Sequence, residues 1–317
     1  MNAVTKTNVL YIGGTGRSGS TVLAGAVGRY QSLVPVGELR YLWDRGLRQN
    51  QLCGCREPFR ECPFWSDVIA DAFGGFAAVD RLDAVGWLED LDRLRFIPLL
   101  AAPSAIRRGR FQRTLEAYGD AVSRLYRSIA TVAGARVVID STKDPAYAYL
   151  LAAAGVFDMS VVHLIRDSRA VAHSWTRAHV RPEIHWRVEY MKRRSPLRTA
   201  LFWDGNHVLF EMLGRRDRPR YLRLRYEDFV RLPDVSAAQV AAMADRSGPG
   251  QDLVMRTDGG WPHSISGNPV RFQDGPLEIR LDNEWETNLG RRDRRVVTFV
   301  TAPLLKRYDY LGNARSA

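Results

Sequence analysis

The segment YIGGTGRSGST, residues 11–21, has residue types and spacing suited to binding an anion. A hydrophobic run leads into glycines, which let the backbone turn sharply and approach a ligand closely. The helix that follows directs free N–H groups and its positive dipole end at the same place. Gly14 and Gly19 have P-loop spacing, but Ser20 stands where such a loop carries lysine. The segment therefore predicts an anion site in which Arg17 supplies the cation and hydroxyls act as donors.

A second segment, VVHLIRDSRAVAHSWTR at residues 161–177, predicts another anion site. A buried strand ends at Ile165, and Arg166 follows at its carboxyl end, with Asp167 or Ser168 capping the next helix. Ligands of open α/β sheets bind beyond the carboxyl ends of strands. Arg166 and Ser174, eight residues apart, are therefore expected near the glycine loop. The alternative is that neither residue binds a ligand: Arg166 forms a salt bridge, and Ser174 is a solvated serine on the helix.

Nearly continuous apolar runs alternate with helical patterns along the chain. Such runs are typical of strands buried on both faces, and their alternation with helices predicts an α/β fold with a three-layer, mostly parallel central sheet and helices on both faces. Residues 66–112 break the alternation and are expected to be a mainly helical insertion in a single domain, 1–317. The five expected strands lie in NVLYIGG, SLVPVGE, ARVVIDST, MSVVHLIRD and PRYLRLRYEDFV.

Composition limits the class of protein. The 317 residues are 45% hydrophobic and 26% charged, which is ordinary for a globular domain. A net charge of +11 favours an anionic partner, but the basic residues are spread along the chain and form no known nucleic-acid module. No apolar stretch is long enough to span a membrane and the N-terminus lacks a signal-peptide core. We therefore expect a cytoplasmic protein.

Three cysteines, Cys53, Cys55 and Cys62, lie within ten residues. Their odd number argues against a disulfide framework. A zinc site needs four ligands, and no fourth is evident nearby, so small buried thiols in a structured loop are expected and a metal site is the alternative. His263, which precedes a glycine at residue 267, is a weak candidate for contact with a nucleotide.

Taken together, GTGRSGST and LIRDSRAVAHS resemble the nucleotide-binding motifs of sulfotransferases that use 3′-phosphoadenosine 5′-phosphosulfate (PAPS). The first resembles the family's 5′-phosphosulfate loop and the second its 3′-phosphate motif. LRYEDFV resembles the segment with a tyrosine by the adenine, HSISGNPVRF the loop that closes on the 3′-phosphate, and VIDSTKDP the element with a lysine near the transferred group. The CGC…CPFW stretch also recurs in bacterial members. The resemblance extends from about residue 8 to residue 285.

The resemblance implies a P-loop-like sulfotransferase fold and transfer of a sulfuryl group from PAPS to a hydroxyl, releasing adenosine 3′,5′-bisphosphate. No metal is expected, because arginine and lysine can neutralise the charge that develops on the leaving phosphate. The residues that this resemblance assigns to the donor are Gly16, Arg17, Ser18, Gly19, Ser20, Thr21, Arg166, Ser174, Tyr226, Gly267, Asn268 and Arg271.

The expected catalytic residues are Arg17, Lys143 and Glu38. Many cytosolic members carry a histidine two residues after the lysine, where this chain has Pro145. Other bacterial and carbohydrate-directed members use a glutamate about twenty residues after the loop, and Glu38 lies 21 residues after Arg17. Glu38 is therefore the candidate base. The alternative is a structural role for Glu38, as a carboxylate that forms an ion pair or caps a helix.

The acceptor is expected to be a small-molecule, glycan or lipid hydroxyl in a pocket built by residues 66–112 and 176–200. Aromatic side chains there suit any of these classes, and the basic run MKRRSPLR leaves a peripheral membrane contact open. The alternative functions are a P-loop kinase-like phosphotransferase and a non-catalytic binder of anions or nucleic acid. The aromatics are Trp87, Trp175, Trp186 and Tyr190.

Overall fold

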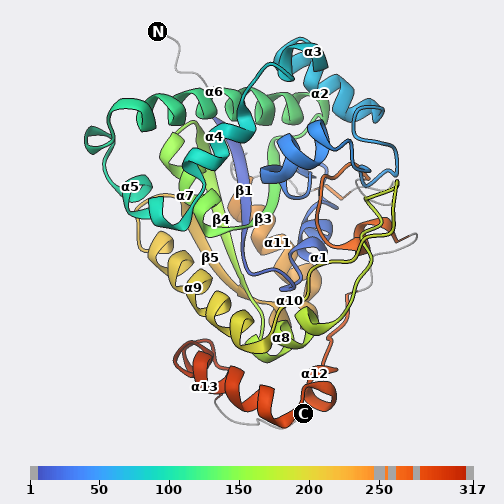
Figure 1. Ribbon diagram of the computed structural model, residues 1–317, viewed down its shortest axis with the longest axis vertical. Coiled ribbons are helices and arrows are strands. Elements are labelled where there is room, and N and C mark those ends of the chain that lie inside the picture. The colour runs from blue at the N-terminus through green and yellow to red at the C-terminus, as the bar shows by residue number, and fades with distance from the viewer. Residues whose placement is uncertain (1–5, 246–253, 256–261, 274–278, 312–317) are drawn as a thin grey trace.

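The computed structural model describes residues 6–245, 254–255, 262–273 and 279–311. A five-stranded sheet lies at its centre, every strand of which is parallel to its neighbours, in the order β2-β3-β1-β4-β5 (Figure 1). The sheet confirms the predicted α/β architecture, and its strands lie in the five segments where the sequence predicts strands. Their bounds are β1 Thr7–Gly14, β2 Leu33–Pro35, β3 Val137–Lys143, β4 Phe157–Ile165 and β5 Arg220–Arg225.

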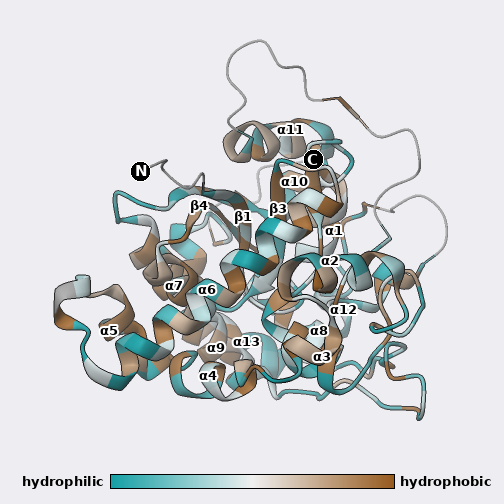
Figure 2. Ribbon diagram, turned by 90° about the horizontal axis from the view of Figure 1, so that it is seen from above, coloured by the Kyte–Doolittle hydropathy of each residue, from teal (hydrophilic) through white to brown (hydrophobic). Residues whose placement is uncertain are grey.

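Both faces of the sheet are covered by helices, as predicted. Successive side chains of a strand point to opposite faces: Val9 and Tyr11 join one hydrophobic core, and Leu10 and Ile12 join the other. The first core is closed by α6 (Gly109–Val132), α7 (Pro145–Ala154) and α9 (Pro196–Gly214). The second is closed by α1 (Ser20–Val27) and α11 (Pro233–Ala244). Figure 2 shows these layers from above, with hydrophobic residues predominating in the buried helix α7.

Residues 74–108 form short helices and turns beside α6 (Figure 1). No helix in the described ranges is long and apolar enough to cross a membrane. The remaining α-helices are α2 Pro63–Phe73, α3 Phe76–Val79, α4 Ala84–Leu91, α5 Ile97–Ala101, α8 Ser168–Thr176, α10 Tyr226–Arg231, α12 Trp285–Asn288 and α13 Arg291–Arg307. The other helical turns are η1 Leu39–Tyr41, η2 Leu42–Arg48, η3 Leu94–Phe96, η4 Ser104–Ile106 and η5 Pro269–Phe272, and η2 is π-helical.

Caps fix how the chain leaves the carboxyl edge of the sheet. The carboxylate of Asp144 accepts the N–H of Ala146 at the start of α7, and that of Asp167 accepts the N–H of Arg169 at the start of α8. Both caps follow a strand directly, so they orient the residues between strand and helix. The sequence also predicts that α1 continues to about Tyr30. It ends at Val27 instead, with Gly28 as its C-cap, and Tyr30 forms a bridge with Met255.

Candidate active site

The glycine loop between β1 and α1 lies at the carboxyl edge of the sheet. Gly19 and Arg17 both have left-handed backbones, with φ of 88° and 72°. Ser18 is buried, and its hydroxyl donates to the carbonyl of Thr15 at 2.7 Å, so it stabilises the loop from within. No side chain of the described residues caps α1. Its first N–H groups are therefore available to an anionic ligand.

Two aromatic rings hold the loop in place. A Cβ on Gly16 would lie 2.7 Å from the ring of Trp175, whose indole N–H donates to the Gly16 carbonyl at 3.2 Å. A Cβ on Gly19 would lie 2.3 Å from the ring of Tyr226. Close packing therefore requires glycine at both positions, and the left-handed backbone favours it at Gly19 as well. Trp175, considered in the sequence only as an acceptor-side aromatic, contacts the anion loop.

Arg166 joins the loop to Tyr226. One Nη of Arg166 donates to the carbonyl of Arg17 at 3.1 Å, and its guanidinium lies 4.9 Å from the centre of the Tyr226 ring. The other Nη donates to the Asp282 carboxylate at 3.1 Å. Partial burial acts to raise the pKa of Asp282, but Arg166 lowers it below its ordinary value. The loop, Arg166 and Tyr226, which the sequence predicts from three separate motifs, are thus in contact. Asp282 is a neighbour that the sequence did not suggest.

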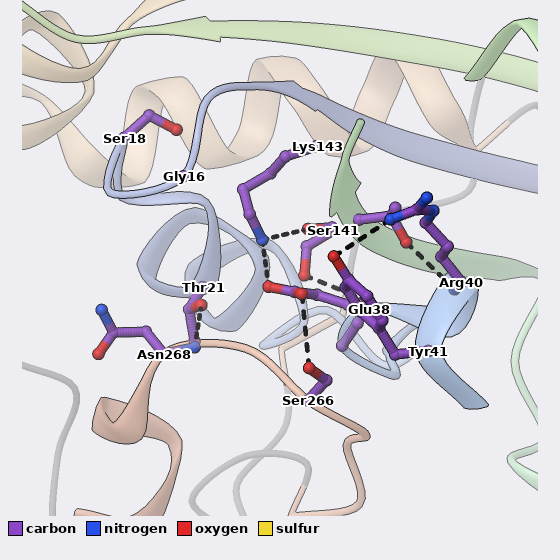
Figure 3. Close-up of polar contacts among 12 residues, drawn as sticks. Gly16, Ser18, Thr21, Glu38, Arg40, Tyr41, Ser141, Lys143, Ser266 and Asn268 are labelled. Carbon is purple, nitrogen blue, oxygen red and sulfur yellow. Dashed lines mark hydrogen bonds and ion pairs between the residues drawn. The ribbon is translucent and has the colours of Figure 1, made fainter. Parts of the chain in front are cut away.

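Glu38 and Lys143 form an ion pair at the same edge (Figure 3). Glu38 is buried just after β2, and its second carboxylate oxygen accepts from the Ser266 hydroxyl at 3.5 Å. Lys143 ends β3 with φ of 71°, and its Nζ also donates to the Ser141 carbonyl at 2.9 Å. The two strands lie side by side in the sheet, so residues 105 positions apart in the sequence meet.

Asp140 holds the segment that follows Glu38. It is fully buried in β3 and accepts hydrogen bonds from the backbone N–H of Leu39 at 3.4 Å, from Tyr126 at 2.5 Å and from the Thr142 hydroxyl at 2.6 Å. Burial raises the pKa of Asp140 to about 6, although these hydrogen bonds oppose the shift. Sequence reasoning missed this residue. The available indication was a carboxylate within the apolar strand VVIDST.

A C-terminal segment, Ser264–Asn268, lies across the start of α1. The backbone N–H of Asn268 donates to the Thr21 hydroxyl at 3.3 Å (Figure 3). Gly267 has φ of 114°, and a Cβ there would contact both Thr21 and Glu38. The segment thus connects the anion loop to the carboxylate.

Five of the residues that the sequence predicts at the donor do not line the cleft: Arg166 and Tyr226, which contact the glycine loop, and Arg271, Ser174 and Ser18. The guanidinium of Arg271 is buried and donates to the carbonyls of Ser264 at 2.6 Å and Leu52 at 3.2 Å, so it joins two loops. Ser174 is half-buried on α8, one residue before Trp175. Ser18 is inside the loop. Their roles toward a nucleotide stay predictions.

A cleft of about 610 Å³ opens in front of the loop and the ion pair. Arg17 lies at one side, where its Nη2 contacts the Met191 sulfur at 2.8 Å and burial lowers its pKa. Cations outnumber carboxylates along the walls, which suits anionic ligands. The predicted site residues that line the cleft are Gly16, Arg17, Gly19, Ser20, Thr21, Glu38, Lys143, Gly267 and Asn268. Its other charged residues are Asp44, Arg45, Asp144, Arg181, Glu189, Lys192 and Arg194.

The far wall of the cleft comes partly from the predicted segments. Residues 181–194 line it, with Trp175 and Tyr190, whereas the 66–112 insertion contributes only Leu94 among the described residues. Trp87 packs on the core and Trp186 lies exposed beside His185. A segment that the sequence did not suggest also contributes, with Tyr41, Asp44, Arg45, Gln49 and Gln51.

Comparison with known proteins finds similarity in solved structures alone. No family model and no curated protein matches the chain. The sulfotransferase domain from the curacin biosynthetic pathway is 16% identical with a TM-score of 0.49, over 94% of this chain and 99% of that one. The sulfotransferase domain from the Synechococcus PCC 7002 olefin synthase is 19% identical with a TM-score of 0.45, over 94% of this chain and 97% of that one. At such low identities and TM-scores, the question of activity rests on the geometry of the cleft.

Proposed function

We propose that the protein is a sulfotransferase that transfers a sulfuryl group from PAPS to the hydroxyl of a small-molecule, glycan or lipid acceptor. The observation that carries the proposal is the contact of the glycine loop with Arg166 and Tyr226. An anion loop alone suits many phosphorylated ligands. A second cation beside an aromatic ring, adjoining that loop, suits a nucleotide with phosphate groups on both its 5′ and its 3′ side.

The described residues fit such a donor. The start of α1, with Ser20, Thr21 and Arg17, would hold the 5′-phosphosulfate. Arg166, with Ser174, would hold the 3′-phosphate in place of the Asp282 carboxylate that it binds here. Tyr226 would adjoin the base, and Gly267 and Asn268 would close over the loop. When bound, PAPS supplies the activated sulfuryl group.

The chain's own residues would orient the acceptor and move its proton. Glu38 is a buried carboxylate on the cleft wall, suited to accept the proton of an acceptor hydroxyl. Lys143 and Arg17 line the same cleft and would balance charge on the leaving bisphosphate. Ser266 hydrogen-bonds to the Glu38 carboxylate, and Asp140 binds the N–H of Leu39, so both act as positioning residues.

A P-loop kinase is the competing function. A kinase of this kind holds Mg²⁺ through a hydroxyl of the loop and an acidic residue on a neighbouring strand. Asp140 is the carboxylate on β3, the strand beside β1, but Tyr126, Thr142 and Leu39 donate to it and hold it in the core. This arrangement favours the sulfotransferase over the kinase.

Ligand-dependent thermal stabilisation tests the proposal. Adenosine 3′,5′-bisphosphate should raise the melting temperature more than adenosine 5′-phosphate does, and Mg·ATP should have little effect. Stabilisation by Mg·ATP alone would contradict the proposal and favour the kinase; stabilisation by DNA alone would favour the nucleic-acid binder. Transfer of label from PAPS to a mixture of hydroxyl acceptors then tests the activity itself.

Two variants locate the 3′-phosphate. Arg166→Ala should weaken binding of the bisphosphate by about tenfold or more, because it removes a charged hydrogen-bond donor. Asp282→Asn should strengthen it, because the competing carboxylate is gone, and should leave adenosine 5′-phosphate unaffected. Equal effects of both variants on both nucleotides would refute this assignment.

A further inference from the structure

A cluster of three thiols and one imidazole lies outside the cleft. Cys53 and Cys55 belong to a short hairpin closed by a bridge between Leu52 and Pro58, and Cys62 immediately precedes α2. His263 comes from the C-terminal segment, 201 residues after Cys62. Cys53 and Cys62 are buried, Cys55 and His263 half-buried. No other group of metal-ligating side chains occurs in the described ranges.

The separations within this cluster match the edges of a metal tetrahedron. The sulfurs of Cys55 and Cys62 are 3.6 Å apart, and Nδ1 of His263 lies 3.3 Å from the Cys62 sulfur and 3.9 Å from the Cys53 sulfur. All four ligand atoms lie within 4.8 Å of one another. Tetrahedral zinc, with its usual bond lengths, requires S···S distances of about 3.8 Å and S···N distances of about 3.6 Å. The four side chains are therefore preorganised for one ion.

Two residues, a glycine and a buried arginine, hold together the segments that carry this cluster. A Cβ on Gly54 would lie 2.4 Å from the carbonyl of Pro262, so only glycine allows the hairpin to approach the histidine segment this closely. Arg271 binds a carbonyl of each segment, those of Leu52 and Ser264, and so joins the two segments. The ring of Phe64 stacks on His263, with centroids 5.2 Å apart, and fixes the orientation of the imidazole.

We propose that Cys53, Cys55, Cys62 and His263 bind one Zn²⁺ ion as a closed structural site. Three sulfur donors and one nitrogen in a tetrahedron are the ligand set of structural zinc, and four protein ligands leave no position open for a substrate. Binding releases the thiol protons of the three cysteines, and His263 coordinates through its neutral Nδ1. The sequence analysis found no fourth ligand because His263 is distant along the chain.

A disulfide is the competing use of these thiols. The sulfurs of Cys55 and Cys62 are in contact, but a bond between them would shorten their separation to about 2 Å and leave Cys53 and His263 without a ligand to share. Convergence of an imidazole on the sulfurs is expected for a metal site and serves no purpose in a disulfide. The metal therefore accounts for all four side chains.

The ion would tie the C-terminal segment to the rest of the chain. Residues 264–268 follow His263 directly and carry Ser266 and Asn268, which bind Glu38 and Thr21. If the proposed function holds, loss of zinc should loosen these contacts and weaken nucleotide binding. The zinc site can be tested independently of the proposed function, because its test measures bound metal and not activity.

Metal content of the purified full-length protein, after removal of any affinity tag, tests the site. We expect about one zinc per chain by elemental mass spectrometry, lost in His263→Ala and in Cys62→Ser. His185→Ala is the matched control, because His185 is an exposed histidine whose ring meets that of Trp186 edge-on, and it should keep the metal. Wild-type protein that neither carries zinc nor takes it up after reduction would overturn the proposal.

Cobalt substitution keeps the test informative if a variant fails to fold. Co²⁺ added to zinc-free wild-type protein should produce the strong visible absorption of a tetrahedral ion and a thiolate-to-cobalt charge-transfer band, at one equivalent. Zinc should also protect all three cysteines from alkylation and raise the melting temperature. An octahedral spectrum, or a Cys55–Cys62 disulfide in metal-free protein that survives addition of zinc under mild reduction, would contradict the proposal.

Discussion

The Glu38 carboxylate is in a position to serve as base, and its contacts make the role testable. Glu38→Gln keeps the shape of the side chain and an oxygen acceptor for Lys143, but removes the proton acceptor. Turnover should therefore fall by about 100-fold or more, whereas affinity for adenosine 3′,5′-bisphosphate should change little. Steady-state rates and calorimetric binding measure the two effects separately.

Asp44→Asn provides the control for Glu38→Gln. Asp44 also lines the cleft, but its carboxylate accepts a hydrogen bond from the Gln49 side chain and is not paired with Lys143. A similar loss of turnover in both variants would indicate a general effect of cleft charge rather than a base at Glu38. Full activity of Glu38→Gln would require another base.

Among single residues, the sequence identified those whose motif has a fixed local spacing. Arg17 lies in its loop and Arg166 directly after its strand, and both contact the loop region as expected. Residues defined only by the folded chain were missed: Asp282 on Arg166, Asp140 behind Glu38, and His263 among the cysteines. Residues that come together from distant segments form no local motif, so their contacts cannot be inferred from the sequence.

At the level of elements, the turn from the loop into α1 depends on Gly19. Gly19→Ala should destabilise the fold in two ways, through about 1–2 kcal/mol for a left-handed backbone and through overlap with the Tyr226 ring, which adds about 1–3 kcal/mol. Gly134→Ala separates these effects. Gly134 also has a left-handed backbone, with φ of 60°, but nothing lies within 4 Å of a Cβ there.

Denaturant unfolding of the two alanine variants measures the difference. Gly19→Ala should lose more free energy of unfolding than Gly134→Ala, and the excess should shrink when Tyr226→Ala is added, because the two sites are in contact. Equal losses in the two single variants would show that Tyr226 does not constrain the loop.

Strands β1, β3 and β4 were predictable because both their faces are largely buried, which makes most of each strand an apolar run, whereas β5 is partly exposed and carries three arginines. Helix α8 was predictable from Asp167, which caps it as expected, and α7 likewise begins after a capping aspartate, Asp144. The π-helical segment Leu42–Arg48, which lines part of the cleft, was not predictable, because π-helices are rare and have no recognisable residue pattern. This wall of the cleft was therefore harder to predict than the glycine loop.

For the whole molecule, a buried histidine pair predicts loss of stability in acid. His163 of β4 faces His207 of α9, with 2.5 Å between Nε2 of His163 and Nδ1 of His207, and His163 also contacts the Tyr221 hydroxyl at 2.5 Å. Burial lowers the pKa of His163 to about 3 and that of His207 well below its ordinary value. The unfolded chain takes up these protons near pH 6.5. Stability is therefore present above pH 6.5 and is lost as the pH falls from there toward 3.

His207→Gln isolates this effect. This substitution removes one of the two imidazoles that take up a proton on unfolding, and it keeps a polar partner for His163. Between pH 6 and 4.5, the free energy of unfolding of the wild type should fall more steeply than that of the variant, by about 1.4 kcal/mol per pH unit. Urea unfolding over this pH range measures how steeply the free energy of unfolding changes with pH in each protein. Buried carboxylates contribute equally to the wild type and the variant, so their contribution cancels in the comparison. If the free energy of unfolding changed equally with pH in both proteins, His207 would titrate alike in the folded and the unfolded state.

The pairing of β1 has a consequence for how the chain assembles. Asn8 of β1 pairs with Val137 of β3 and with Asp158 of β4, so the central strand has no neighbour until more than a hundred further residues exist. Parallel pairing across such separations is slow to form. During synthesis, the glycine loop therefore emerges first but acquires its aromatic supports only after α8 and β5 have followed. Truncated chains that end before Arg166 contain the complete loop sequence and yet should bind no nucleotide.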